Sequence, residues 1–133
     1  MAIIAVTVAC SSAAPTSDAT FPEGALAMLP SDGGGARVEV RTSPAQPPSR
    51  GVTNVKLTIS DMAGAPLDGL RVKVVPWMPA MGHGASVLPT VTPLGHGEYV
   101  VHDVDMFMPG HWELRAEIAG ALEDHVTPTF QIP

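Results

Sequence analysis

The sequence predicts an all-β protein, an immunoglobulin-like antiparallel β-sandwich of about seven strands behind a flexible N-terminal tether. Three observations support this prediction. The 133 residues include 14 Pro and 13 Gly, and prolines at this density would break nearly any helix. Apolar and polar residues alternate in several short segments, which is the period of a half-buried strand. Turn residues separate these segments at close spacing, as in sandwiches built from short antiparallel strands.

The alternation is clearest in residues 111–118. Trp112 and Leu114 are expected to face the core, while Glu113 and Arg115 face water. Trp112 is the residue we expect to find between the two sheets. The expected strands are 37–41, 52–59, 70–77, 87–91, 98–104, 111–118 and 124–132.

The chain is expected to hold one folded domain, residues 36–133, because its length suffices for a single core. Residues 11–35 are rich in Ser, Ala, Pro, Gly and Asp, and we expect them to form a flexible linker. Residues 1–10 form a short apolar run that ends at Cys10 and resembles the tail of a bacterial lipoprotein signal, whose cysteine is lipidated.

No Lys or Arg precedes this run, and the run is short for a signal, so either the protein starts further upstream or the match arises by chance. The lipoprotein interpretation predicts a cell-envelope location, on the periplasmic side or the surface. Membrane attachment would then occur only through a lipid anchor at Cys10, because the run is too short to span a bilayer.

The charge and the motifs exclude several classes of function. A net charge of −6 disfavours nucleic acid and anionic membrane surfaces as partners, since both are polyanions. The sequence contains no nucleophile beside a base, no phosphate-binding loop and no zinc-ligand spacing. We therefore expect a protein that is not an enzyme.

Residues 76–111 contain four of the seven methionines and four of the five histidines. Thioether sulfur and neutral imidazole together suit the soft ion Cu(I). If consecutive strands run antiparallel, the loops 78–86 and 105–110 lie at one end of the sandwich, whereas His96 lies at the other. The expected metal ligands are Met78, Met81, His83, Met106, Met108 and His111, with Trp77 as a cation–π cap.

Two other interpretations of the methionines stay open. In the first, each methionine fills a gap in a small core, as buried methionine usually does. The alternation of Met106, Phe107 and Met108 favours this interpretation, because one face of that alternating segment must be core. Alternatively, the Met-rich loops form an apolar patch that docks a protein of the cell envelope.

Three motifs lie within residues 74–118: M-P-A-M-G-H-G, P-T-V-T-P-L-G-H-G-E-Y and M-P-G-H-W-E-L. This stretch resembles the YtkA-like domain, which is related to FixH. Such domains are small exported or membrane-tethered β-sandwich modules, found alone or joined to copper and heavy-metal efflux components. The resemblance implies the sandwich fold, copper-trafficking or efflux proteins as partners, and metal binding at Met78, Met81, His83, Met108 and His111. The expected function is an exported module that buffers or transfers Cu(I).

Overall fold

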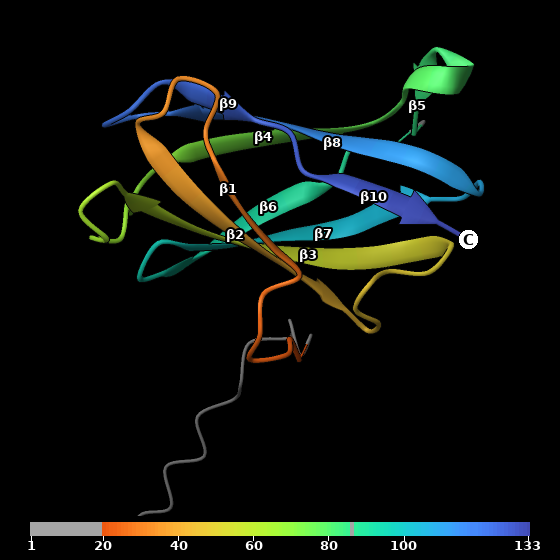
Figure 1. Ribbon diagram of the computed structural model, residues 1–133, viewed down its shortest axis with the longest axis horizontal. Coiled ribbons are helices and arrows are strands. Elements are labelled where there is room, and N and C mark those ends of the chain that lie inside the picture. Colours follow the sequence, from red (N-terminus) through yellow and green to blue (C-terminus); the bar gives the residue numbers. More distant parts are fainter. Residues whose placement is uncertain (1–19, 86) are drawn as a thin grey trace, which may run out of the picture.

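The computed structural model describes residues 20–85 and 87–133, which form two stacked antiparallel sheets (Figure 1). The first sheet has the strand order β1-β2-β3-β7-β6, and the second has the order β10-β8-β4-β5, with β9 also paired to β8. The strands are β1 (Ala27–Pro30), β2 (Ala36–Ser43), β3 (Gly51–Asp61), β4 (Arg71–Met78), β5 (His83–Gly84), β6 (Thr90–Gly95), β7 (Glu98–Met106), β8 (Gly110–Ala119), β9 (Asp124–Val126) and β10 (Thr129–Ile132). The predicted β-sandwich is confirmed.

The structure has more strands than the sequence predicts, because some are very short. β1 lies within the expected linker and pairs with β2. β5 has two residues and pairs only with the end of β4. β9 and β10 together cover the expected strand 124–132, and both pair with β8. The strand is interrupted at Pro128, whose carbonyl still accepts a hydrogen bond from the N–H of Leu114 at 2.8 Å.

The core lies between the sheets and follows the predicted alternation. Trp112 is fully buried, and Leu114 is buried beside it. Arg115 is exposed and Glu113 is partly exposed on the outer face of the same strand. Each large apolar side chain buried in this way contributes roughly 1.5–3 kcal/mol to folding. The assignment of Trp112 to the space between the sheets is confirmed.

The residues before β1 are held against the first sheet, although the sequence predicts a flexible linker there. The guanidinium of Arg41 on β2 donates a hydrogen bond to the carbonyl of Glu23 at 2.8 Å. The ammonium of Lys56 on β3 lies 5.2 Å from the centroid of the Phe21 ring, within the range of a cation–π contact. The described part of the expected linker is therefore bound to the domain by two basic side chains.

Asp124 fastens the turn between β1 and β2 to β9. Its carboxylate accepts hydrogen bonds from the backbone N–H groups of Gly33 and His125, each at 2.8 Å. A hydrogen bond from the Ser31 hydroxyl and these backbone bonds lower the pKa of Asp124 from its ordinary value of 3.8 to about 2. The ionised carboxylate is therefore the form that stabilises this turn.

We predict that Asp124→Asn lowers stability at neutral pH, because the amide keeps the shape of the carboxylate but loses its charge. The folded pKa of about 2 lies below the ordinary value of 3.8, so the stabilisation is complete above about pH 4 and is lost as the pH falls through 2. Urea unfolding at several pH values measures this difference, with Glu123→Gln as the control on the neighbouring exposed carboxylate. If the difference in the free energy of unfolding between wild type and Asp124→Asn stays constant down to pH 2, the prediction is wrong.

Candidate metal centre

The two Met/His loops meet at one end of the sandwich, on the right in Figure 1. β4 ends at Met78 and β8 begins at Gly110, and the two strands pair antiparallel through Trp77 and Glu113. The contact is close, because a Cβ atom added to Gly110 would lie 2.7 Å from the terminal methyl carbon of Met78. The geometric prediction that both loops share one end is confirmed.

His96 lies at the opposite end, as predicted. It occupies the tight turn between β6 and β7, with a positive φ of 53°. The neighbouring carbonyl of Gly97 accepts a hydrogen bond from the N–H of Ile59 at 2.7 Å. This turn precedes β7, whereas the second Met/His loop follows it, so the length of β7 separates the two.

A single helical turn places Met81 and His83 beside the end of β4. Pro79–Met81 form the 3-10 helix η1, and Gly82 ends it in the left-handed conformation with φ of 66°. Glycine adopts this conformation without steric cost, so the chain can reverse here. His83 then pairs with Met78 across the β4–β5 ladder.

Two of the six expected ligands belong to the hydrophobic core. Met78 is 4% exposed and Met106 is fully buried, and both pack within the main cluster between the sheets. Their burial fits the interpretation in which methionine fills core space. The buried side chains of Met78 and Met106 therefore form the apolar part of the core next to the end where the loops meet.

Three other expected ligands remain accessible at this end. Met81 is 51% exposed at the end of η1, and His83 is exposed on β5. Met108 is partly buried against the core in the loop before β8. These three residues supply two thioethers and one imidazole from two different loops.

His111 is exposed but faces in another direction. It precedes the buried Trp112 on β8 and pairs with Gln131 of β10, so its side chain lies on the outer face of the second sheet. His83 pairs with the inward-facing Met78 and therefore lies on the inner side. The structure thus separates the two imidazoles that the sequence analysis grouped.

Trp77 also lies on the outer face, because it alternates with the buried Met78. The guanidinium carbon of Arg115 lies 4.8 Å from the centroid of the Trp77 ring. Arg115 in turn donates a hydrogen bond to the carboxylate of Glu113 at 3.0 Å. The cation–π partner of Trp77 in this structure is therefore an arginine of the neighbouring strand.

The sequence analysis missed the aromatic contact that joins the loops. The ring of Phe107 is stacked with His83, with centroids 6.2 Å apart and planes 8° apart. Phe107 also contacts Trp112 edge-on, with centroids 5.5 Å apart. The sequence signal for this role is a large apolar residue placed between two methionines in a tight turn.

Comparison with protein-family models matches residues 34–117 to the YtkA-like family. The chain belongs to the YtkA-like family. The match extends from β2 into β8 and includes both loops at the Met/His end. Searches of curated proteins and of solved structures found no match.

Among residues 20–85 and 87–133 of this YtkA-like domain, no three His, Cys, Asp or Glu side chains are grouped as they would be around a metal ion. Methionine is not one of these donor types. The same residues contain no helix with the length and hydrophobicity of a membrane span. Cys10 lies outside the described residues.

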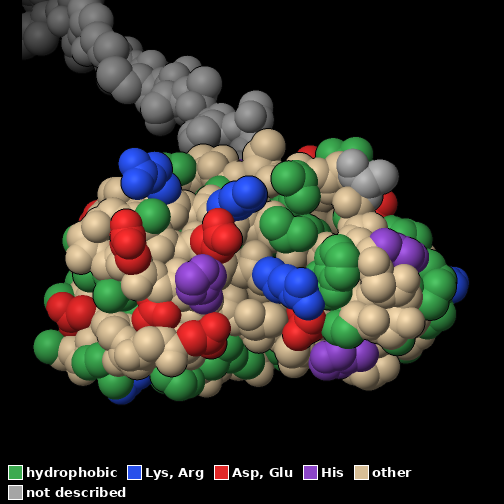
Figure 2. Space-filling model, turned by 90° about the horizontal axis from the view of Figure 1, so that it is seen from above, with side chains coloured by type: hydrophobic (Ala, Val, Ile, Leu, Met, Phe, Trp, Pro, Cys, Tyr) green, Lys and Arg blue, Asp and Glu red, His purple; other side chains and the backbone are tan. Residues whose placement is uncertain are grey.

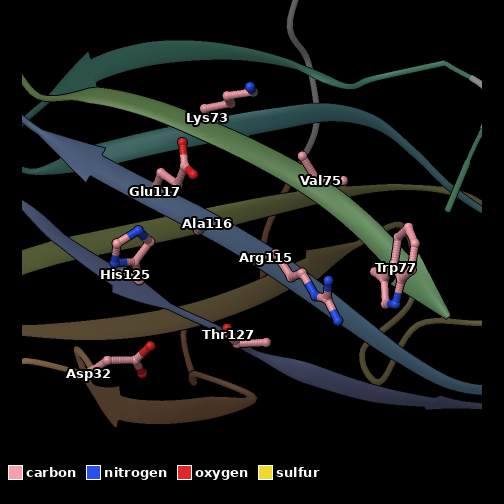
Figure 3. A pocket seen from close by; sticks show the side chains of 9 residues that line it. All are labelled: Asp32, Lys73, Val75, Trp77, Arg115, Ala116, Glu117, His125 and Thr127. Atoms are coloured by element: carbon pink, nitrogen blue, oxygen red, sulfur yellow. The ribbon is translucent and has the colours of Figure 1, made fainter. Parts of the chain in front are cut away.

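The outer face of the second sheet carries a separate hollow of about 420 Å³. Figure 2 shows acidic, basic and histidine side chains mixed over this face of the YtkA-like domain. Figure 3 shows that β4 and β8 supply most of the lining, and that two basic and two acidic side chains take part. The lining residues are Asp32, Lys73, Val75, Trp77, Arg115, Ala116, Glu117, His125 and Thr127. Trp77 is the only expected metal-site residue in this lining.

We predict that Met106→Ala and Met81→Ala differ strongly in their effect on stability. Truncating the fully buried Met106 removes core contacts and leaves a cavity, so the free energy of unfolding should fall by about 2–5 kcal/mol. Truncating the exposed Met81 should change it by less than about 0.5 kcal/mol. Denaturant unfolding of both variants measures the difference, and equal losses would contradict the division into core and accessible methionines.

Proposed function

We propose that this YtkA-like domain is an exported copper-binding module that buffers Cu(I) or transfers it to another protein. The observation that supports this most directly is the meeting of two Met/His loops at one end, with Met81, His83 and Met108 left accessible. Two thioethers and one imidazole form a soft donor set of low coordination number, which suits Cu(I). The proposed ligand set is therefore narrower than the six residues predicted from the sequence.

The buried methionines have a supporting role in this proposal. Met78 and Met106 fill the core directly beneath the loops, and their apolar side chains limit the access of water from below. A metal site next to these buried methionines would be open to solvent on one side only. This suits a Cu(I) ion that the protein must receive and release. The proposed role is non-enzymatic, because a thioether-rich donor set favours holding Cu(I) over redox cycling.

We predict that the purified protein retains one equivalent of Cu(I) in an anaerobic titration against a competing chelator. The double variant Met81→Leu, His83→Ala removes one thioether and the imidazole, so its affinity should fall by at least about a hundredfold. Both residues are exposed, so the fold should remain intact.

The matched control is the double variant Met28→Leu, His125→Ala, because these residues are also an exposed methionine and histidine but lie elsewhere on the domain. Its affinity for Cu(I) should equal that of wild type. If wild type keeps no Cu(I) in competition, or if both double variants lose it equally, the metal proposal is wrong.

A second candidate function is docking of a cell-envelope protein through the same end. The observation in its favour is that Met81, Val87, Leu88 and Phe107 are all exposed apolar side chains in or beside the two loops. Copper-trafficking or efflux proteins of the envelope are the proposed partners in either case. Binding of such a partner to metal-free protein, unchanged by Cu(I), would favour docking alone.

We also propose that the domain reaches the cell envelope and is anchored by a lipid on Cys10. The support is the apolar run that ends at this cysteine and the polar residues that follow it. Mass spectrometry of the protein isolated from membranes tests this proposal. A mature N-terminus at an acylated Cys10 is expected, whereas an unmodified Cys10 still preceded by the apolar run would exclude the anchor.

A further inference from the structure

His83 has one ring nitrogen engaged with the backbone. Its Nδ1 atom lies 3.3 Å from the carbonyl oxygen of Gly84. A carbonyl oxygen only accepts hydrogen bonds, so this contact requires the hydrogen on Nδ1. The lone pair of the neutral ring is then on Nε2, which makes Nε2 the nitrogen available to a metal ion.

The 3.3 Å contact is long and His83 is exposed, so the backbone bond alone leaves the ring free to turn. Phe107 supplies the second restraint, because its ring lies nearly parallel to the imidazole. Phe107 is 43% exposed, an unusual position for a side chain that gains so much from burial.

Phe107 is itself held by the core. The fully buried Trp112 contacts it edge-on at 5.5 Å between centroids. The indole N–H of Trp112 donates a hydrogen bond to the carbonyl of Met108 at 2.9 Å, which fixes the turn that carries both Phe107 and Met108. A rigid path of contacts therefore runs from the core through Phe107 to His83.

We propose that Phe107 is a positioning residue, which holds the His83 imidazole in the orientation and tautomer that present Nε2 as a metal ligand. This inference rests on the proposed function for the ligand role of His83. The position of the ring in metal-free protein does not depend on that function. Phe107 also links the β4–β5 loop to the loop before β8, so that donors from both loops keep a fixed relation.

The test uses nuclear magnetic resonance on the metal-free full chain, at about pH 8 where an ordinary imidazole is neutral. Long-range proton–nitrogen correlation reports which nitrogen of His83 carries the hydrogen. We expect the Nδ1–H form in wild type, with ring-current shifts from Phe107 on the imidazole protons. In Phe107→Leu these shifts should vanish and the two tautomers should mix.

The same variants are then titrated with Cu(I). Loss of one aromatic contact predicts an affinity about three- to tenfold lower in Phe107→Leu. Phe107→Tyr keeps the ring and should restore both the tautomer and the affinity. Leu94→Ala is the control, because Leu94 is similarly exposed, at 47%, but lies beside the turn at the opposite end.

The outcomes separate the two proposals. A hydrogen on Nε2 in wild type, or a tautomer and ring shifts unchanged in Phe107→Leu, would overturn the positioning role whether or not Cu(I) binds. The expected tautomer behaviour together with no retention of Cu(I) by wild type would overturn the copper function, and would leave Phe107 as a residue that only orders the imidazole.

Discussion

The structure depends on the burial of the Trp112 indole, whose N–H group makes one hydrogen bond within the protein. Trp112 is fully buried between the sheets, and burial of its N–H without a partner would cost about 1–3 kcal/mol. The carbonyl of Met108 is that partner, at 2.9 Å. Because this carbonyl belongs to the turn between β7 and β8, the requirement that stabilises the core also fixes the shape of the turn. The same indole supports Phe107, so the largest core residue organises the end of the domain where the loops meet.

The pairing of β4 with β8 explains why the methionines divide into two groups. Antiparallel strands bring the end of one beside the start of the other, and the alternation along β4 and β7 then points Met78 and Met106 into the core. Met81 and Met108 lie beyond the ends of the regular ladder, where no facing strand covers them fully. Methionine thus packs in the core between the sheets and also supplies accessible thioethers at the end of the sandwich where the two loops meet.

The two sheets differ in what covers their outer faces. The first sheet holds residues 21–23 through Arg41 and Lys56. The second sheet has no such covering segment among the described residues, and its outer face carries a hollow lined by charges of both signs.

The sequence by itself determined the β-sandwich, the buried position of Trp112 and the common end of the two loops, because these follow from alternation, turn residues and strand direction. It did not determine which methionines are accessible. Met78 and Met81 lie on either side of Pro79 and Ala80, and where the pairing of β4 with β8 ends decides which of the two is buried. Tertiary structure also decided that His111 faces away from His83 and that Arg115 covers Trp77, because both depend on which residues pair across strands distant in sequence. Register is a property of two strands together, and neither strand encodes it alone.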